Sequence, residues 1–350
     1  MINTGISFYF SNDMVKNEEA IKKAIHNEVK YIFTSLHIPE ESGIDYKNHI
    51  KKILKRCKEG NLKLIVDVGP ETLEKLGIKT IEKLQEFGIT HVRLDYGFSP
   101  KEMIRISESL HVVLNASTIT EDQLLEWNRC GADFTKFSAC HNYYPKPYTG
   151  LSIKRVKEIN QRLKSLGFTT MAFVPGNAKL RSPLFQGLPT VEEHRWRKDN
   201  VLLNMLELLY EGLCDVVLIG DPEVDDKSWL QIKNLSHNYV ELKADIVTPY
   251  EFVRNTIHHD RLDSSQYVIR SQESRTYNQV ELKESKYPVM ERKPGSIFIS
   301  NHLFLRYCGE LEIARISLPK EERVTIIGQI EKSCLIYLPY IKNGLGVRLV

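Results

Sequence analysis

Short hydrophobic runs alternate with amphipathic segments from the N-terminus to about residue 235. The runs are rich in β-branched and aromatic residues, as in GISFYF (5–10), whereas segments such as NEEAIKKAIHNE (17–28) and SIKRVKEINQRLKSL (152–166) have helical periodicity. Eight runs predict strands, at 5–10, 31–36, 62–68, 91–96, 111–117, 133–140, 168–174 and 215–220. Eight strands, each followed by a helix, predict an α/β fold that closes into a (β/α)8 TIM barrel.

The pattern changes after about residue 235. Strand-like runs then follow one another with little helix between them, at 239–247, 266–275, 295–305, 309–318, 323–330 and 334–350. The sequence therefore predicts a TIM-barrel domain at residues 1–235 and a small, mostly antiparallel β domain at residues 236–350. No GxGxxG motif follows the first run, so a dinucleotide-binding Rossmann fold loses its main support.

Composition and charge exclude several classes of function. The 350 residues are 42% hydrophobic and 27% charged, which is typical of a globular protein. A net charge of +3 without charged blocks predicts no nucleic-acid partner. The N-terminus lacks the features of a signal peptide and no apolar stretch reaches membrane-spanning length, so we expect a cytoplasmic protein with no membrane partner. The 6 cysteines form no CxxC pair, which disfavours a zinc site or a disulfide framework.

Polar residues stand near the C-terminal end of nearly every predicted strand, which is the end of a TIM barrel that carries its chemistry. Because side chains alternate along a strand, Arg93 and Asp95 share a face, and we expect both to point into the barrel mouth. The polar residues at these ends are Tyr9, Thr34, Asp67, Arg93, Asp95, Asn115, His141, Asn142, Asn177 and Asp221.

Asp67 and Asp95 occupy comparable places in adjacent predicted strands. Neighbouring strands are about 4.8 Å apart, so the two carboxylates can approach to about 5 Å, which is the spacing of a retaining glycosidase pair. Two close carboxylates do not ionise equally, so we expect one to be an acid and the other, helped by Arg93, to be an anion. The alternative interpretation is a structural ion pair between Arg93 and Asp95 that plugs the barrel.

The stretch CHNYYPKPYTG (140–150) leaves the sixth strand at the same end. His141 has no HxH or HExxH partner, and no neighbour would stabilise Cys140 as a thiolate, so a metal site and a cysteine nucleophile are both disfavoured. The remaining interpretation is a platform for a sugar. His141 and Asn142 would bond to the hydroxyl groups of the sugar, and Tyr144 would stack on the sugar ring.

Other segments compete for these roles. In LPTVEEHR (188–195), the spacing of Thr190 and Glu193 predicts a capping box, so Glu193 is either a capping partner or a catalytic acid, while Glu192 and His194 remain freer. Asp221 precedes a proline and either caps a turn or joins the site. TIM barrels often bind phosphate groups near the loops after strands 7 and 8, so a phosphorylated ligand would find its fixed donors there. The candidate phosphate ligands are Asn177, Lys179 and Arg181 after the seventh strand, and Arg270, Ser271 and Arg275 in the β domain. The alternative for the arginines among these candidates is a surface-exposed role.

Taken in order, several motifs resemble the intracellular 6-phospho-N-acetylmuramidases. They are GISFYF, LIVDVGPETLEKLGI, VRLDYGF, LNAS, CHNYYPKPYTGL, AFVPGN, LPTVEEHR, IRSQESR and GELEI. The resemblance extends over both predicted domains and implies a TIM barrel followed by a cyclophilin-like β domain. It implies hydrolysis of the β-1,4 bond of 6-phospho-N-acetylmuramyl-N-acetylglucosamine, to 6-phospho-N-acetylmuramic acid and N-acetylglucosamine, in peptidoglycan recycling. The partner is then a phosphorylated amino-sugar disaccharide, and no metal or organic cofactor is implied.

We expect Asp95 and Asp67 to be the catalytic pair. The 2-acetamido group of such a substrate can itself attack the anomeric carbon, so the sequence leaves retaining, inverting and substrate-assisted routes open, together with the roles of the two carboxylates. The oligomeric state is also open. The residues expected to contact substrate are Tyr9, Arg93, Asn115, His141, Asn142, Tyr144, Asn177, Glu192, Arg270 and Ser271.

Two rival functions remain at this point. Lys136 falls in the predicted sixth strand and could be the Schiff-base nucleophile of a sugar-phosphate aldolase, although it lies five residues before His141 and so deeper than the chemical end. The other rival is a protein that binds a sugar phosphate without turnover. Borohydride trapping of Lys136 would support the aldolase, and binding without product would support the second rival.

Overall fold

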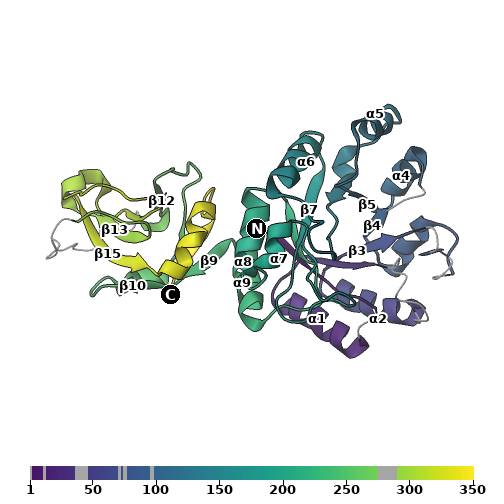
Figure 1. The fold of residues 1–350 in the computed structure, drawn as a ribbon, viewed down its shortest axis with the longest axis horizontal. Coiled ribbons are helices and arrows are strands. Elements are labelled where there is room, and N and C mark those ends of the chain that lie inside the picture. Colours follow the sequence, from purple (N-terminus) through teal and green to yellow (C-terminus); the bar gives the residue numbers. More distant parts are fainter. Residues whose placement is uncertain are drawn as a thin grey trace. The chain divides into compact units, whose positions relative to one another are not determined.

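The computed structural model describes residues 2–10, 13–35, 46–69, 72–73, 77–94, 98–274 and 290–350. The chain divides into two compact units, which we call the barrel unit (residues 2–233) and the β unit (residues 234–350) (Figure 1). Each unit has its own sheets and its own buried side chains, and each is described by itself.

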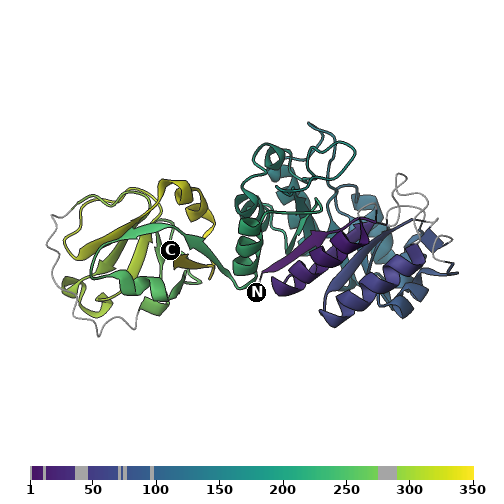
Figure 2. The same ribbon diagram turned by 90° about the horizontal axis from the view of Figure 1, so that it is seen from below.

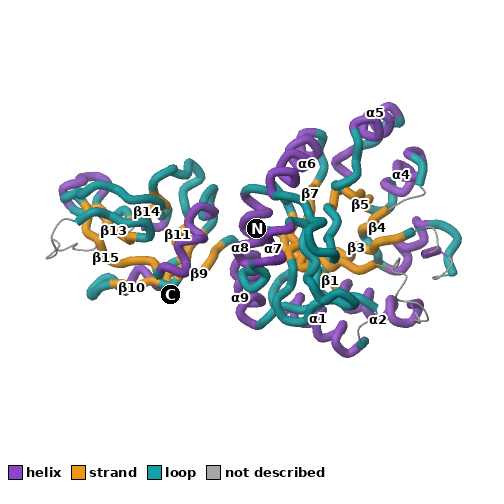
Figure 3. The backbone as a smooth tube through the Cα atoms, in the orientation of Figure 1, coloured by secondary structure: helices purple, strands orange, loops and turns teal. Residues whose placement is uncertain are grey.

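The barrel unit contains eight parallel strands that close into a barrel in the order β1 to β8. The predicted TIM barrel is therefore confirmed, and Figure 3 shows these strands surrounded by helices. The strands are β1 (Asn3–Ser7), β2 (Tyr31–Ser35), β3 (Lys63–Val68), β4 (His91–Leu94), β5 (His111–Asn115), β6 (Phe137–Cys140), β7 (Thr169–Val174) and β8 (Val216–Ile219).

The helices of this unit lie outside the strands, and Figure 2 shows α1, in purple, running along the outer side of the barrel. Capping boxes at Ser99 and Thr120 start α4 and α5, because each hydroxyl accepts the third main-chain N–H of its helix. The almost wholly apolar α8 is buried from Val201 to Leu208. No helix of the described residues is long and apolar enough to cross a membrane. The helices are α1 (Met14–His26), α2 (Tyr46–Glu59), η1 (Ile81–Phe87), α4 (Pro100–Ser107), α5 (Glu121–Arg129), η2 (Phe134–Lys136), α6 (Ile153–Ser165), α7 (Glu192–Trp196), α8 (Val201–Tyr210) and α9 (Asp226–Ser236).

The barrel interior is a packed core, so a site can form only at its ends. The strand register places Ser35 beside Asp67 and Asp67 beside Arg93, at the interior-facing positions that follow this core toward the C-terminal end. The core is built from alternate residues of the strands, namely Tyr31, Phe33, Ile65, Val113, Cys140, Met171, Phe173, Val216 and Leu218.

The N-terminal end of the barrel is closed by packed polar and aromatic side chains. The Nζ atom of Lys63 lies 5.1 Å from the centre of the Tyr31 ring, and the rings of His91 and His111 are 4.7 Å apart. Nε2 of His111 lies 2.7 Å from Oγ of Ser138. Burial lowers the pKa of His91 to about 3 and that of His111 to about 4, so both rings are neutral near pH 7. These contacts indicate a stabilising role for this end.

The β unit is small and mostly β, as predicted, with a five-stranded sheet in the order β10-β15-β13-β14-β12 and a three-stranded sheet in the order β11-β16-β9. The strand predicted from residue 334 is wrong over its first part, which forms the 3-10 helix η6 (Lys332–Tyr340). Pro339 has no N–H for a sheet, and Cys334, Tyr337 and Leu338 share the buried side at helical spacing. The strands are β9 (Tyr239–Leu242), β10 (Ala244–Ile246), β11 (Ile257–His259), β12 (Val268–Arg270), β13 (Ser296–Ser300), β14 (Leu311–Ala314), β15 (Val324–Ile330) and β16 (Gly346–Leu349), and two shorter 3-10 helices are η3 (Glu251–Asn255) and η5 (His302–Tyr307).

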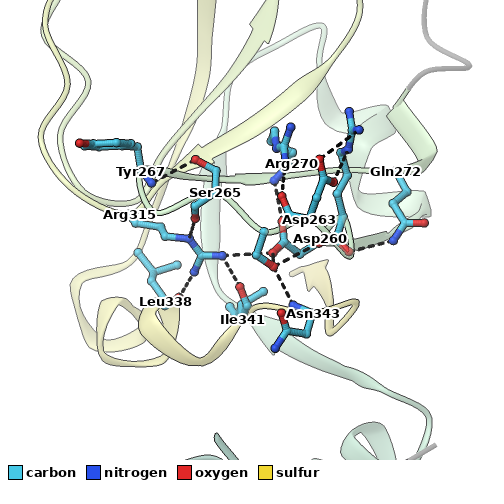
Figure 4. A network of polar contacts seen from close by, with 12 residues as sticks. Asp260, Asp263, Ser265, Tyr267, Arg270, Gln272, Arg315, Leu338, Ile341 and Asn343 are labelled. Atoms are coloured by element: carbon cyan, nitrogen blue, oxygen red, sulfur yellow. Dashed lines mark hydrogen bonds and ion pairs between the residues drawn. The ribbon is translucent and has the colours of Figure 1, made fainter.

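A buried ion pair joins several segments of the β unit (Figure 4). Asp260 is fully buried, and its Oδ2 accepts hydrogen bonds from Oγ of Ser264 (2.6 Å) and Nη2 of Arg315 (3.2 Å). Its Oδ1 accepts from the main-chain N–H of Arg270 at 2.9 Å. Arg315 also donates to three main-chain carbonyls, those of Ser265, Leu338 and Ile341.

Candidate active site

Asp67 on β3 and Arg93 on β4 form an ion pair at the C-terminal end of the barrel. Nη1 of Arg93 lies 3.2 Å from Oδ1 of Asp67, and Nη2 of Arg93 donates to Oδ1 of Asn142. Oγ of Ser35 donates to Oδ2 of Asp67 at 3.2 Å. The side chain of Asp67 is 15% exposed and that of Arg93 is 6% exposed, so the carboxylate is the more accessible member. The barrel mouth therefore contains a reachable carboxylate beside a nearly buried cation.

The strand register shows which residue of β4 lies opposite Asp67. Arg93 is the residue opposite Asp67, and Asp95 comes two residues later in the chain. Asp95 lies outside the described residues, so its pairing with Asp67 or Arg93 stays a prediction.

His141, the residue directly before Asn142 in the sequence, is fully buried. Its Nδ1 lies 3.2 Å from Oγ of Ser117, and its Nε2 lies 3.0 Å from Oδ1 of Asn160. Because Nδ2 of Asn160 donates to the carbonyl of Gly212, its Oδ1 is the acceptor, and the network assigns the proton to Nε2 of His141. Burial lowers the pKa of His141 to about 4, so the ring is neutral. This geometry favours a positioning role for His141 over the predicted sugar contact.

The tyrosines of the 140–150 stretch occupy three different environments. Tyr143 packs edge-on against Phe173 at a ring separation of 5.2 Å, and its hydroxyl accepts a hydrogen bond from Nη1 of Arg181 at 3.2 Å. Tyr144 is half-buried, and its main-chain N–H bonds to the neighbouring loop. Tyr148 is 83% exposed. Tyr143 is therefore the tyrosine most firmly built into the mouth, although no pattern in the sequence ranks it first.

The preceding thiol, Cys140, is unsuited to nucleophilic attack. It is fully buried in the barrel core, and burial raises its pKa to about 12. The disfavoured cysteine nucleophile therefore receives no support from its surroundings.

Tyr9 and Arg181 form a second polar cluster at the mouth. The guanidinium of Arg181 lies 3.9 Å from the centre of the Tyr9 ring. Tyr9 is fully buried, and its hydroxyl donates to the carbonyl of Gly220 at 2.6 Å. Burial and then the neighbouring Tyr143 raise the pKa of Tyr9 well above its ordinary value. Two neutral phenols therefore support one arginine cation, and Tyr9 is covered rather than open to a sugar.

Asp221 holds the loop after β7 in place. Its side chain is buried, and its carboxylate accepts the main-chain N–H groups of Gly176, Arg181 and Leu188, each at 2.9 Å. Burial raises the pKa of Asp221, and the three N–H groups oppose that rise. Of the two roles that the sequence allowed, the structure supports the turn cap.

The two remaining asparagines differ in what they can offer to a ligand. Oδ1 of Asn177 accepts from the N–H of Asp225 at 2.9 Å, and its Nδ2 donates to Oγ of Ser228 at 3.1 Å. Oδ1 of Asn115 accepts from the N–H of Ser117 at 3.1 Å. Among the described residues, Nδ2 of Asn115 has no hydrogen-bond partner. Asn115 is therefore the better candidate for a substrate contact.

The capping box predicted at Thr190 and Glu193 is wrong. Val191 is the N-cap of α7, and its side chain makes no capping bond. The hydroxyl of Thr190 instead accepts from the N–H of Phe173 and donates to the carbonyl of Asn142, both at 2.9 Å. Thr190 thus connects β7 to the loop after β6.

Glu192 is fully engaged by N–H donors of the protein. Its Oε1 accepts from the main-chain N of Tyr148 and Nε of Arg195, both at 2.8 Å. Its Oε2 accepts from the N–H of Gly150 at 2.8 Å and from Nη2 of Arg195 at 3.3 Å. Burial alone would raise the pKa of Glu192, but the bonds from Arg195 and the two main-chain N–H groups outweigh it and lower the pKa. A direct substrate contact by this carboxylate is therefore disfavoured.

His194, the other candidate in that loop, is also occupied. It is fully buried, and its Nε2 lies 2.6 Å from Oε2 of Glu207, which also pairs with Arg197. His194, Glu207 and Arg197 connect α7 to α8, and we call this group the α7–α8 cluster.

The candidates in the β unit have partners within that unit. Nη2 of Arg270 lies 3.1 Å from Oδ2 of Asp263, and the Arg270 side chain is 25% exposed. Ser271 is buried, and its Oγ lies 2.9 Å from Nδ1 of His258. Their contact with substrate stays a prediction, and Arg275 lies outside the described residues.

Lys136 lies away from the mouth. It ends the 3-10 helix η2 just before β6, at the N-terminal end of that strand, and it is exposed. Its predicted place inside the sixth strand is therefore wrong, because the Asp133 side chain caps a helical turn there. Within the described part of the chain, no group of three or more His, Cys, Asp or Glu side chains is arranged to hold a metal ion.

Two family models together match almost the whole chain. The model described as 6-phospho-N-acetylmuramidase, N-terminal, matches residues 4–234, and the model described as 6-phospho-N-acetylmuramidase, C-terminal, matches residues 239–350. No curated protein matches the chain.

Two solved structures are similar over their full length. A conserved protein of unknown function from a locus in Enterococcus faecalis has 32% sequence identity and a TM-score of 0.74, with 99% of this chain and 96% of that chain covered. An uncharacterized B. cereus protein has 27% identity and a TM-score of 0.73, with 100% of this chain and 99% of that chain covered. Both likenesses therefore include the barrel unit and the β unit.

Proposed function

The chain belongs to the 6-phospho-N-acetylmuramidase family of glycosidases, and from this premise we propose that it hydrolyses 6-phospho-N-acetylmuramyl-N-acetylglucosamine. The products are 6-phospho-N-acetylmuramic acid and N-acetylglucosamine, and the role is peptidoglycan recycling in the cytoplasm. The observation that carries the proposal is the partly accessible Asp67 carboxylate beside Arg93 at the barrel mouth.

In the proposed reaction, Asp67 acts as an anion. The Arg93 guanidinium at 3.2 Å complements its negative charge, and Ser35 holds its other oxygen. Asp67 would then attack the anomeric carbon, activate water, or orient the substrate acetamido group for attack on that carbon. In the first and third routes, water afterwards attacks the same carbon and breaks its bond to Asp67 or to the acetamido oxygen, which releases 6-phospho-N-acetylmuramic acid. Asp95 would protonate the glycosidic oxygen as N-acetylglucosamine leaves. The Arg93 bond to Asn142 fixes the guanidinium, so the charge beside Asp67 is already in place before substrate binds.

We assign the phosphate contact to Arg181. Its guanidinium is held by the Tyr9 ring and the Tyr143 hydroxyl in the loop after β7, the region where TIM barrels often bind phosphate. Lys179, the other cation of that loop, lines a hollow of about 150 Å³ together with Lys16 and Lys23 of α1. Arg181 is the better candidate because it lies against residues of the mouth and presents a planar group suited to phosphate.

The test compares the phosphorylated disaccharide with its unphosphorylated form. Purified protein is incubated with each, and release of N-acetylglucosamine is followed over time. We expect turnover only with the phosphate present. Binding without release of either sugar would overturn the proposal, and equal cleavage of the two substrates would remove the phosphate contact from it.

A further inference from the structure

The ion pair between Glu192 and Arg195 joins two loops of the barrel mouth. The loop after β6 (141–150) carries Asn142, which bonds to Arg93, and the loop after β7 (175–190) carries Arg181. Arg195, on α7, reaches main-chain carbonyls of both loops. Any role of this pair in placing groups around a substrate rests on the proposed function.

Arg195 gathers carbonyl groups from both loops around one guanidinium. Its Nη2 donates to the carbonyl of Tyr144 at 2.5 Å, and its Nη1 donates to those of Gln186 at 2.8 Å and Gly187 at 3.1 Å. Longer contacts of 3.4 Å reach the carbonyls of the two residues that follow Tyr144. The Arg195 side chain is only 2% exposed, so water does not replace these bonds.

Glu192 completes the pair from the opposite side. It holds Arg195 through both carboxylate oxygens and accepts the N–H groups of Tyr148 and Gly150, farther along the loop after β6. A Cβ atom at Gly150 would lie 2.7 Å from Oε2 and 2.9 Å from the main-chain N of Glu192, so glycine is needed for this approach. The sequence spacing of Glu192 and Arg195, three residues apart on α7, puts both on one helix face.

We infer that Glu192 and Arg195 are positioning residues that set the separation of the two mouth loops, and so place Asn142 and Arg181 for substrate binding. Neither residue contacts the reacting atoms. A lysine in place of Arg195 keeps the charge but lacks the planar fork of donors that serves several carbonyls at once. The pair therefore depends on the geometry of arginine and not on its charge alone.

A purely stabilising role is the alternative, and the α7–α8 cluster provides a matched control. Glu207 pairs with His194 and Arg197. His194 lies on α7 next to Arg195, Arg197 comes just after α7, and neither His194 nor Arg197 belongs to a mouth loop. Glu207→Gln therefore loses ionic bonds in the same region while it leaves the loop contacts of Arg195 intact. Glu192→Gln and Arg195→Lys instead weaken the loop contacts themselves, because glutamine has one acceptor oxygen in place of two and lysine lacks the planar fork of donors.

The first measurement is hydrogen exchange of the full-length protein, which needs no activity. In Arg195→Lys and Glu192→Gln, we expect the amides of 144–150 and 185–190 to exchange at least about 10-fold faster, because the bonds from Arg195 to the loop carbonyls and from Tyr148 and Gly150 to Glu192 no longer hold the two loops in place. In Glu207→Gln, we expect these amides to exchange as in the wild type. Unchanged exchange in both mouth-loop variants would overturn the inference, as would equal loosening of the loops by Glu207→Gln.

The second measurement separates binding from chemistry on the phosphorylated disaccharide, at a temperature where all variants are folded. We expect kcat/KM to fall about 10- to 100-fold in Arg195→Lys, mostly through a higher KM, because the loops no longer place Asn142 and Arg181. Glu207→Gln should keep the wild-type KM. A loss confined to kcat, or an equal rise in KM for Glu207→Gln, would overturn the inference. If the wild type itself does not cleave the disaccharide, the proposed function fails, and the exchange measurement alone decides whether the pair holds the loops.

Discussion

Asp67 differs from the other acids of the barrel mouth in what its carboxylate is bonded to. Asp221 and Glu192 are each held by three or more N–H donors of the protein and have no free face for chemistry. Among the described residues, Asp67 is bonded only by Arg93 and Ser35, and it is 15% exposed. A reacting carboxylate needs both a charge partner and room for substrate, and Asp67 is the acid of the described mouth that combines them.

Replacement of Asp67 by asparagine tests this assignment. An asparagine at this position would keep the size of the side chain but lose the charge beside Arg93, so we expect kcat to fall by about 10²- to 10⁴-fold with little change in fold. The measurement is release of N-acetylglucosamine, with circular dichroism as the check on folding. Asp215→Asn is the control, since Asp215 pairs with Lys164 just before β8, at the other end of the barrel. Near-normal turnover of Asp67→Asn would contradict the assignment.

The proposed phosphate contact distinguishes Arg181 from Lys179, the other cation of the same loop. In Arg181→Met, we expect the preference for the phosphorylated disaccharide over the unphosphorylated one to fall by at least about 10-fold, because a charge-assisted contact is removed. In Lys179→Met, we expect that preference to be kept. The measurement is the ratio of kcat/KM for the two substrates. A lost preference in the Lys179 variant alone would move the phosphate to the hollow beside α1.

The strand pattern predicted where the barrel mouth lies, but it could not predict which of its polar side chains already have hydrogen-bond partners within the protein. Strand alternation is periodic, so it predicted that Arg93 faces the barrel mouth, where the structure pairs Arg93 with Asp67 of the neighbouring strand. It could not show that His141 is saturated by Ser117 and Asn160, because these partners come from distant segments. The pairing of Glu192 with the mouth loops likewise depends on loop geometry. The periodicity of hydrophobic residues in the sequence gives no information about such contacts.

At the scale of elements, the eight barrel strands were predictable because they are short, buried runs, most of them rich in β-branched or aromatic residues. The strand prediction failed where burial and periodicity disagree, at η6 and η2, and also at residues 302–305 of the run 295–305, which lie in η5. In η6, a hydrophobic run with a proline packs as a 3-10 helix, and in η2 the Asp133 cap forms a turn before β6. Hydrophobic content predicted burial in η6, but local hydrogen bonds decided the conformation.

Three histidines of the barrel are buried or half-buried and neutral, which predicts that the folded protein loses stability in acid. His91 and His111 lie in β4 and β5, and His141 directly follows β6. The pKa is lowered by burial to about 3 for His91 and to about 4 for His111 and His141, below the ordinary 6.5. The unfolded chain therefore takes up these protons first as pH falls below 6.5. Stability is full above that pH and declines toward the folded-state pKa values, by about 2 kcal/mol per histidine between pH 7 and pH 5.

His141→Gln tests this linkage on one residue. We expect the variant to be less stable than the wild type at pH 7, since its ring hydrogen bonds are lost, but to lose about 2 kcal/mol less between pH 7 and pH 5. Urea unfolding at the two pH values gives the difference. The exposed His26, replaced by glutamine, is the control and should leave the pH dependence unchanged. An unchanged pH dependence in His141→Gln would mean that His141 takes up its proton as readily in the folded protein as in the unfolded chain, which would contradict the prediction.

At the scale of the whole molecule, the change in pattern near residue 235 corresponds to a change in architecture. The barrel unit closes its sheet on itself, and the β unit builds two sheets around separate buried side chains. The family resemblance from ordered motifs was confirmed over both units. The finer likeness of the β unit to cyclophilin stays a prediction, because strand runs alone do not specify sheet order.

Separate cores predict separate unfolding transitions. Arg315 and Asp260 lie entirely within the β unit, with side chains 9% and 0% exposed, and Arg315→Met would leave the Asp260 carboxylate buried without its cation. Breaking one partner of such a pair costs about 3–5 kcal/mol, which lowers the transition of a small domain by more than about 10 °C. In calorimetry of the full-length protein, we therefore expect Arg315→Met to shift the β-unit transition and leave the barrel transition within about 2 °C of the wild type. At a pH where His141→Gln destabilises the barrel, we expect this variant to shift the barrel transition and to leave the β-unit transition unchanged. If either variant shifts both transitions equally, the two units unfold as one cooperative body, and the division into independent cores is wrong.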